Sequence, residues 1–315
     1  MSTQKKLSYS QLYYAKLKAK EFGITVDQYL ETKGTKRAAS KFESNEATIS
    51  KSQDIDLSKV GKLRNLAITE EMLQRNTTGQ PIDQLFSYEG GVPVGTNIMC
   101  TGDPGVGKTT VLLHTLANLQ VNNRKLKCLF ISGEMGKIQM FKYTQRFPIF
   151  GEVDTVFASD FMDSNFKSVM EQLLKRGYDY ILMDSIVEVL ETVRDDNGWG
   201  QMQAEKWLID LCVKNNEGLN DRNAFTTMLL IQQVTKAGVF VGSNKMKHIT
   251  DAHMEMRRER ERDGGGTYIE FSKNRNGQAG IRFGYQLSND RIDYGTITQI
   301  EEGEFELENQ VTIGL

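Results

Sequence analysis

Cysteine is scarce in this chain of 315 residues, and its three copies stand far apart at Cys100, Cys128 and Cys212. They form no C-x-x-C pair of the kind that holds zinc, and no secretory leader accompanies them. Histidine is equally scarce, and His248 and His253 are too isolated to indicate a metal site. We therefore expect a protein of the reducing cytoplasm.

The sequence also lacks a long apolar run and internal repeats. No stretch approaches the roughly 20 apolar residues that a membrane-spanning helix needs. The length exceeds one average domain and suits a large α/β domain with a small extension. We therefore expect no membrane segment and no repeat architecture.

Charge is unevenly distributed, although the formal net charge is only −2. Residues 1–40 carry eight basic and three acidic side chains, whereas residues 301–308 contain five glutamates. This asymmetry is typical of an arm that prefers a polyanion and a tail that avoids one, but two solvated surfaces explain it equally well.

A glycine-rich motif is the most specific local signal. Gly102, four further residues and then Gly107, Lys108 and Thr109 match the pattern G-x-x-x-x-G-K-[ST]. An apolar strand pattern precedes it and an apolar helical stripe follows it, which is the context that a phosphate-binding loop requires. The glycines let consecutive N–H groups approach the phosphates at the helix N-terminus. The predicted phosphate-binding residues are Gly102, Asp103, Pro104, Gly105, Val106, Gly107, Lys108, Thr109 and Thr110.

Each residue of the loop has an expected task. Lys108 should reach the β and γ phosphates of ATP, the Thr109 hydroxyl should bind Mg²⁺, and Thr110 should contact the α phosphate. A chance glycine turn is the alternative, which the flanking strand and helix disfavour. The motif therefore predicts a site for ATP and Mg²⁺.

Two further apolar runs end in carboxylates. Asp184 follows the run 180–183 and should lie at the end of a buried strand, where it can hold Mg²⁺ directly or through water. It could instead cap the following helix, although Ser185 is also suited to that task. Glu134 follows the run 128–132 and Gly133, and its carboxylate could orient a water in line with the γ phosphate.

Strand and helix signals alternate along the middle of the chain, which predicts an α/β fold with a mainly parallel, twisted sheet. We expect four parts: a small helical arm at 1–35, a linker at 36–76, a nucleotide-binding core at 77–298 and an acidic tail at 299–315. The last part of the linker, 60–73, should form a lead-in helix. The expected strands are 97–100, 128–132, 155–158, 180–183, 228–232, 268–272 and 281–287.

Five segments in order carry a family resemblance. They are TTGQPIDQLFSYEGGVPVGTNIMCTGDPGVGKTTVLLHTL, CLFISGEMGKIQMFKYTQRF, ILMDSI, IQQVTKAG and SKNRNG. Together they resemble the RecA-superfamily core of bacterial RadA/Sms proteins, and they are nearly as similar to the motor domain of DnaB-type replicative helicases. SGE and VTKAG favour RadA, whereas GEM and RNG favour the helicases. From these 315 residues we expect neither the zinc module nor the protease-like domain of RadA, nor a helicase N-terminal domain.

The resemblance implies a RecA-like core with roles for single residues. Glu134 falls on the catalytic glutamate and Asp184 on the Walker B aspartate. Gln233 falls on the polar sensor of the γ phosphate, with Gln232 as the second choice. Lys273 and Arg275 match the basic pair that completes the ATP site of a neighbouring subunit.

The basic pair also has a reading from spacing alone. Lys273 and Arg275 occupy alternate positions, so in an extended segment both cations face the same side and can approach one anion. A solvated turn with two ordinary charges is the alternative.

Two segments could contact nucleic acid, namely 193–206 after Asp184 and 234–256 after Gln233. Both look loop-like, and the family places its DNA-contacting segments there. Lys236, Lys245 and Lys247 could contact phosphates, and Trp199 could stack on a base or pack at a subunit boundary. Flexible surface loops are the alternative reading. Residues 257–263 look like an exposed turn.

Three functions follow as hypotheses. The first is a DNA-stimulated ATPase that forms a ring, expected to be hexameric, and moves along single-stranded DNA as a helicase with replication or recombination proteins. The second is a filament-forming protein of strand exchange or annealing. The third is a regulatory ATPase of the clock-protein type that acts on proteins.

Overall fold

The computed structural model describes residues 19, 25–26, 60–161, 163–233, 250–259 and 266–299. The chain divides into two units, Met1–Ala67 and Ile68–Leu315. Nearly all of the predicted N-terminal arm, the first part of the linker and the acidic tail beyond residue 299 lie outside the described residues. Within the described residues, no helix has the length and apolarity to cross a membrane.

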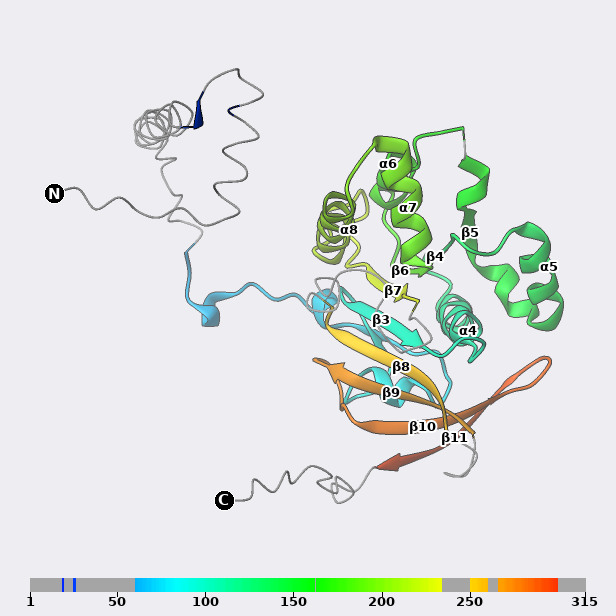
Figure 1. Ribbon diagram of the computed structural model, residues 1–315. Coiled ribbons are helices and arrows are strands. Elements are labelled where there is room, and N and C mark those ends of the chain that lie inside the picture. The colour runs from blue at the N-terminus through cyan, green and yellow to red at the C-terminus, as the bar shows by residue number, and fades with distance from the viewer. Residues whose placement is uncertain are drawn as a thin grey trace, which may run out of the picture. The chain divides into compact units, whose positions relative to one another are not determined.

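A nine-stranded sheet forms the centre of the second unit, in the order β11-β10-β9-β8-β3-β7-β6-β4-β5 (Figure 1). The strands from β8 to β5 run parallel, and β9, β10 and β11 extend the sheet with antiparallel pairs. The predicted α/β fold with a mainly parallel sheet is confirmed. The strands are β3 (Asn97–Gly102), β4 (Cys128–Ser132), β5 (Asp154–Phe157), β6 (Tyr180–Asp184), β7 (Thr227–Ile231), β8 (Ala252–Glu259), β9 (Gly266–Asn274), β10 (Ile281–Leu287) and β11 (Ile292–Gln299).

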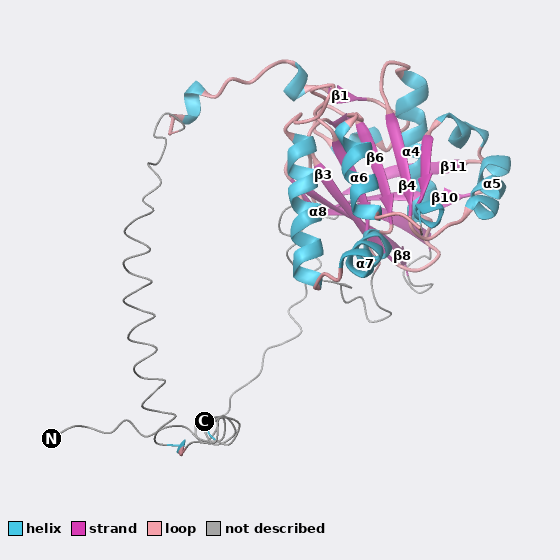
Figure 2. Cartoon of the chain, turned by 90° about the horizontal axis from the view of Figure 1, so that it is seen from above, coloured by secondary structure: helices cyan, strands magenta, loops and turns pink. Residues whose placement is uncertain are grey.

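Helices cover both faces of the parallel strands (Figures 1 and 2). The alternation of β3 divides the core, because Ile98 and Cys100 pack with α4 on one face and Met99 packs with α7 and α8 on the other. A short pair, β1 (Arg75–Asn76) with β2 (Val92–Pro93), forms a separate sheet. The α-helices are α3 (Asp83–Phe86), α4 (Lys108–Asn122), α5 (Lys137–Arg146), α6 (Phe166–Lys175), α7 (Ile186–Asn197) and α8 (Gln201–Asn216).

The expected lead-in helix over 60–73 is wrong. This segment contains only two short 3₁₀ turns, Leu63–Asn65 and Glu71–Leu73, and neither turn buries a residue. Isolated helices of this length are marginal, because most helical stability in proteins comes from packing an apolar face. The large apolar side chains here are exposed: Val60, Leu63, Leu66, Ile68, Met72 and Leu73.

The expected loop over 193–206 is also wrong. Helix α7 continues to Asn197 and α8 begins at Gln201, so a three-residue connection remains. Gly198 ends α7 in the left-handed conformation at φ 63° and donates its N–H to Arg194 O. This cap stops one helix and allows the next to begin almost at once.

The predicted exposed turn at 257–263 is wrong for its first part. Arg257 and Arg258 belong to β8, which runs to Glu259. Met254 and Met256 are buried in the core, whereas Arg257 lies on the other face, which is the period of a strand. Residues 260–263 lie outside the described residues.

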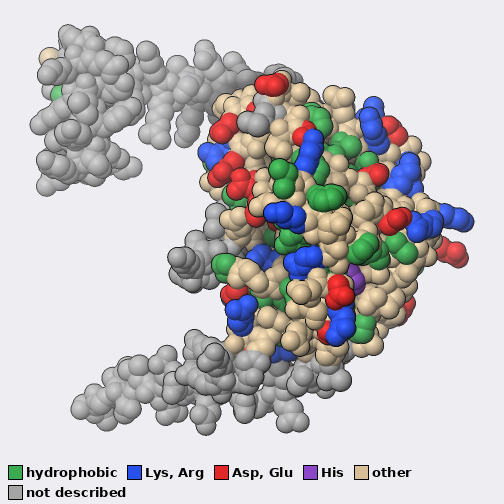
Figure 3. All heavy atoms as spheres, turned by 90° about the vertical axis from the view of Figure 1, so that its right-hand side faces the viewer, with side chains coloured by type: hydrophobic (Ala, Val, Ile, Leu, Met, Phe, Trp, Pro, Cys, Tyr) green, Lys and Arg blue, Asp and Glu red, His purple; other side chains and the backbone are tan. Residues whose placement is uncertain are grey.

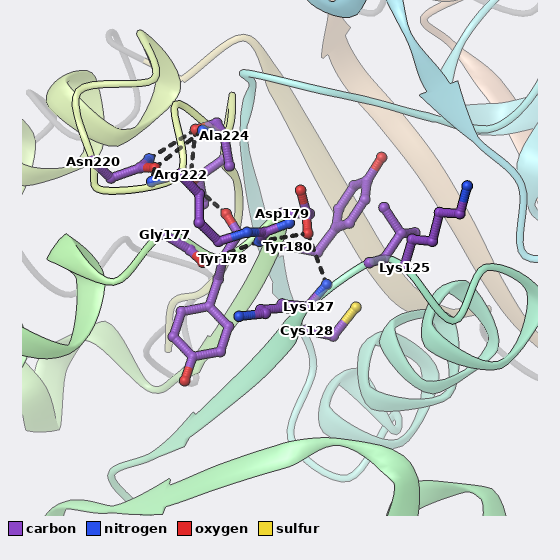
Figure 4. Close-up of polar contacts among 12 residues, drawn as sticks. Lys125, Lys127, Cys128, Gly177, Tyr178, Asp179, Tyr180, Asn220, Arg222 and Ala224 are labelled. Carbon is purple, nitrogen blue, oxygen red and sulfur yellow. Dashed lines mark hydrogen bonds and ion pairs between the residues drawn. The ribbon is translucent and has the colours of Figure 1, made fainter.

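A set of polar contacts fastens the amino edge of the sheet (Figure 4). Asp179 accepts a hydrogen bond from Lys127 N at 2.7 Å and pairs with Arg222 at 2.9 Å. Asn220 Oδ1 accepts from Arg222 N at 3.2 Å in the same turn. These contacts fix the connection from α8 to β7, so this loop has a structural task.

Candidate nucleotide-binding site

The carboxyl edge of the parallel strands gathers the predicted site residues. Ser132 pairs with Asp184, and Asp184 pairs with Ile231, so β4, β6 and β7 end at the same level. Glu134 and Gln233 each follow two residues beyond such an end. A cleft of about 610 Å³ opens at this edge. It is lined by Gly102, Pro104, Gly105, Gly107, Lys108, Thr109, Thr110, Glu134, Met135, Tyr143, Arg146, Asp184, Ile231, Gln233 and Leu287.

The phosphate loop needs glycine at two crowded positions. A Cβ on Gly102 would lie 2.0 Å from Met256 O, and a Cβ on Gly107 would lie 2.2 Å from Leu287 Cδ1. Gly107 also adopts a positive φ of 96° as it leads into α4. The loop therefore runs between β8 and the end of β10, where a larger residue would collide.

Asp103 and Val106 anchor the loop and do not line the cleft. Asp103 Oδ2 accepts a hydrogen bond from Arg258 N at 3.0 Å. Val106 is buried, and its carbonyl accepts from the Tyr285 hydroxyl at 2.6 Å. These two predicted contact residues thus fasten the loop to β8 and β10.

Lys108 lies over the loop that precedes it. Its Nζ donates to Gly102 O at 2.9 Å and to Asp103 O at 3.1 Å. This geometry places an ammonium group at the N-terminus of α4, where the partial positive charge of the helix also favours anions.

Thr109 and Asp184 form a hydrogen-bonded pair, in which the Thr109 hydroxyl donates to Asp184 Oδ2. The Asp184 side chain is 3 % exposed, and burial raises its pKa to about 6, with a smaller contribution from the negative Glu134. The Thr109 hydrogen bond and the Lys108 charge act against this rise. Within the described residues no side-chain hydrogen bond caps α7, so the capping alternative for Asp184 has no support there.

These oxygens suit Mg²⁺. Magnesium prefers oxygen ligands and usually takes one or two from the protein and the rest from phosphate and water. Among the described residues no group of three or more His, Cys, Asp or Glu could hold a metal by itself. The hydroxyl of Thr109 and the carboxylate of Asp184 therefore fit a metal that is shared with bound phosphates.

Glu134 and Gln233 meet across the cleft, where Gln233 Nε2 donates to Glu134 Oε1. Gly133 permits this arrangement, because a Cβ there would lie 2.9 Å from Glu188 Cβ. Gln232 is 3 % exposed and does not line the cleft. The geometry thus favours Gln233 over Gln232 as the residue next to the γ phosphate.

Lys273 and Arg275 lie at the opposite edge of the sheet. Lys273 pairs with His253 near the start of β8, whereas the phosphate loop pairs with β8 at Met256. Neither basic residue lines the cleft of its own chain. The structure therefore does not bring this pair together with the other predicted site residues.

The two basic residues do share one surface. Arg275 is 62 % exposed at its side chain and pairs with Asp251 at 3.1 Å. Lys273 donates to Thr250 O, and burial followed by the nearby charge of Arg275 lowers its pKa. Both cations thus approach the same point on the amino edge.

The sequence reading missed one wall of the cleft. Tyr143 and Arg146 on α5 line it together with Leu287. Arg146 Nε donates to Asn289 O at 2.9 Å, and its guanidinium lies 5.9 Å from the Tyr143 ring centre. The sequence did contain an indication of this wall, because Tyr143 and Arg146 are one helical turn apart on the helix that follows Glu134. Leu287 gave no such signal.

The predicted nucleic-acid residues are only partly described. Lys236, Lys245 and Lys247 lie outside the described residues. Trp199 occupies the connection between α7 and α8 and packs against the part of the core that contains Met99, α7 and α8, with Lys167 Nζ 5.6 Å from its ring centre.

Comparisons with known proteins give relatives that cover part of the chain. DNA repair protein RadA of Listeria monocytogenes is 27 % identical over 172 residues, which are 54 % of this chain and 35 % of that protein. RadA of Mycobacterium tuberculosis is 27 % identical over 193 residues, 60 % of this chain and 37 % of the relative. RadA of Aquifex aeolicus is 26 % identical over 212 residues, 67 % and 44 % respectively. The chain thus spans less than half the length of these relatives.

No protein-family model matches the chain. Among solved structures, a KaiC-like protein of the archaeon Pyrococcus horikoshii superposes with a TM-score of 0.54 at 18 % identity, over 71 % of this chain and 100 % of that one. This likeness shows the fold. The relatives and this fold together support a RecA-superfamily P-loop ATPase that resembles RadA.

Proposed function

We propose that this chain hydrolyses ATP with Mg²⁺ and uses the reaction to move along single-stranded DNA as a helicase in replication or recombination. One observation carries the proposal: Lys108, the Thr109–Asp184 pair and the Glu134–Gln233 pair converge in one cleft. The relatives that are named DNA repair proteins support the DNA context.

Binding of the phosphates falls to the loop and α4. Lys108 exchanges its contacts with the loop carbonyls for the β and γ phosphate oxygens. The Thr109 hydroxyl and the Asp184 carboxylate would hold Mg²⁺, which would supply positive charge against the charge that develops on the phosphates.

Glu134 orients the attacking water. Its carboxylate stands at the end of β4, and a positioned base of this kind contributes about 10² to 10⁴ in rate. Gln233 donates to the same carboxylate and lines the same cleft, so its amide can respond to a γ phosphate bound next to Glu134. The presence or loss of that phosphate then changes the hydrogen bonding at the end of β7.

Tyr143 and Arg146 supply the flat faces of the cleft. An aromatic ring and a guanidinium plane are suited to stack on a nucleotide base. We assign the base to this wall because the opposite groups in the cleft are the phosphate loop and the carboxylates.

A neighbouring copy completes the site. Lys273 and Arg275 cannot serve their own cleft from the opposite edge of the sheet, but an exposed Arg275 can leave Asp251 for the γ phosphate of another subunit. Repetition of one head-to-tail contact closes a ring when the rotation permits it. We propose a hexameric ring.

The receiving surface is the face that carries α5 (Figure 3). Acidic and basic side chains are interspersed there with exposed hydrophobic ones. Ile138 and Phe141 of α5 are 77 % and 64 % exposed. Exposed apolar side chains beside a nucleotide cleft are suited to a subunit contact.

The decisive experiment measures the ATPase rate with and without single-stranded DNA, together with unwinding of a forked duplex. Stimulation with unwinding supports the proposal. Stimulation without unwinding, with filaments in negative-stain images, supports the strand-exchange alternative. An ATPase rate that is unchanged by single-stranded DNA would contradict the proposed motor function and would favour a regulatory role.

A further inference from the structure

A second groove lies between α6 and α8, which stand side by side in both ribbon views (Figures 1 and 2). It has a volume of about 620 Å³ and shares no lining residue with the nucleotide cleft. Both tryptophans of the chain, Trp199 and Trp207, line it. The proposed hydrolysis does not use this groove, although Trp199 and Lys206 belong to the segment 193–206 that the sequence offered for contact with nucleic acid.

The two indole rings are held by polar contacts. Trp207 Nε1 donates to Glu171 Oε1 at 2.9 Å, and Glu171 also pairs with Lys167 at 2.9 Å. Lys167 in turn lies 5.6 Å from the ring centre of Trp199. The carboxylate of Glu171 is therefore balanced within the protein, and the rings are fixed before any ligand arrives.

The remaining charges of the groove are mainly positive. Lys206 and Lys214 on α8 and Lys175 on α6 line it, against Asp210 as the other acid. Lys206 and Lys214 are eight residues apart on one helix, which places them about 12 Å apart along its axis. Cations thus follow the length of the groove, as a polyanion requires.

A buried acceptor also lines this groove. Asn215 is 3 % exposed, and its Nδ2 donates to Leu211 O at 2.9 Å. Its Oδ1 has no hydrogen-bond partner within the described part of the chain. Leaving a buried polar atom unpaired is costly, so a small side-chain movement that lets a ligand N–H or O–H reach this atom is favoured by the hydrogen bond that forms.

We infer that this groove binds single-stranded nucleic acid. Bases stack on Trp199 and Trp207, a base N–H donates to Asn215 Oδ1, and the phosphates lie towards the lysines. Aromatic faces combined with a basic groove are the usual means of holding unpaired bases without regard to sequence. An acidic peptide would also meet the lysines, but it has less use for two fixed indole faces.

The inference rests on the proposed function for the choice of a DNA strand, and its test uses no nucleotide. Tryptophan fluorescence reports on this groove alone, because both tryptophans line it. Titration of the full chain with oligothymidylate should quench the fluorescence. Duplex DNA should quench far less, and a strand of abasic sites should bind roughly tenfold or more weakly, since it keeps the phosphates and loses stacking.

Charge variants test the lysines. Lys206→Gln with Lys214→Gln should weaken binding and reduce the slope of log affinity against log salt by about 1.4, the loss for two phosphate contacts to a single strand. Lys125→Gln with Lys127→Gln removes the same charge before β4 and should leave binding unchanged. Circular dichroism and binding of a fluorescent ATP analogue verify that each variant is folded.

Three outcomes overturn the inference. The first is a labelled strand that binds without changing tryptophan fluorescence. The second is equal binding by both lysine double variants. The third is quenching by a glutamate-rich peptide but not by DNA. Single variants Trp199→Phe and Trp207→Phe should each retain part of the quenching.

The inference and the proposed function can fail separately. If the chain shows no ATPase activity but the groove binds DNA, the inference stands.

Discussion

Replacement of Arg275 by alanine tests whether the ATP site is shared between copies. The variant should bind nucleotide normally, because Arg275 lies outside the cleft of its own chain. Hydrolysis should fall by a factor within the roughly 10³ to 10⁵ attributed to arginine fingers, or by somewhat less if Lys273 compensates. A fluorescent ATP analogue measures the binding, and phosphate release measures the turnover.

If Arg275 acts only on a neighbouring copy, mixing two inactive variants should restore part of the ATPase activity. Along β8, the four residue steps from Ala252 to Met256 rise about 13 Å, so Arg275 cannot reach the loop of its own chain. Mixing Arg275→Ala with Glu134→Gln subunits in equal amounts joins an intact Glu134 to an intact Arg275 at about one interface in four of a head-to-tail ring. The mixture should therefore recover about a quarter of the wild-type rate per site.

A mixing experiment decides between action in trans and in cis. Each parent is assayed alone and after mixing, and co-assembly is verified by affinity capture of one tagged variant. Action within one chain cannot be rescued, because mixing never restores both groups to the same polypeptide. Mixed assemblies that remain as inactive as their parents would refute the shared site.

Three further changes probe the cleft and its helix. Lys108→Ala should abolish binding of a fluorescent ATP analogue, because the loop loses its ammonium group, and unchanged affinity would contradict the assignment. Glu134→Gln should retain binding but lower turnover by about 10² or more, and a near-normal phosphate-release rate would move the catalytic role elsewhere. Burial lowers the pKa of His114 below its ordinary 6.5. As the pH falls through 6.5, His114 is therefore protonated in the unfolded chain but not yet in the folded chain, and the free energy of unfolding decreases. Urea unfolding should therefore show wild-type stability falling on acidification more steeply than that of His114→Gln, and parallel pH profiles would contradict this.

The buried parallel strands could be predicted because their chemistry is local. β3, β4, β6 and β7 are buried at every residue, and each forms a continuous apolar or small run in the sequence. Parallel strands covered on both faces have this pattern. The ends of such runs also locate Glu134 and Asp184, since carboxyl ends of parallel strands meet at one edge.

The antiparallel strands were harder to predict. β8 alternates buried methionines with charged residues, and its arginines resemble an exposed turn when they are read alone. Arg257 is stabilised by Glu255 two residues earlier, at 2.6 Å on the same face, and by the strand beside it. The pairing of β8 with β9 joins two segments that are separated in sequence. The periodicity of a short stretch such as 257–263 therefore could not show that it begins in a strand.

The wall formed by Tyr143 and Leu287 was missed for a related reason. Leu287 reaches the cleft because β10 ends beside Gly107, and this contact joins residues far apart in the chain. The lead-in segment 60–73 shows the converse error, since its apolar residues suggested a helix with a buried face, whereas its large apolar side chains are exposed. The periodicity of a short stretch of sequence indicates which face of an element is apolar, but it does not indicate which other element packs against that face.

The antiparallel strands link the two halves of the proposed shared site. Two hydrogen bonds hold the phosphate loop at one edge of the sheet: Asp103 N donates to Met256 O of β8, and the Tyr285 hydroxyl of β10 donates to Val106 O. At the other edge, the end of β9 carries Lys273, which we propose serves a neighbouring copy. These strands are hydrogen-bonded to one another along the sheet. Because these strands are joined along the sheet, a phosphate loop fastened to β8 and β10 is structurally connected to the basic pair that, in our proposal, serves the next subunit.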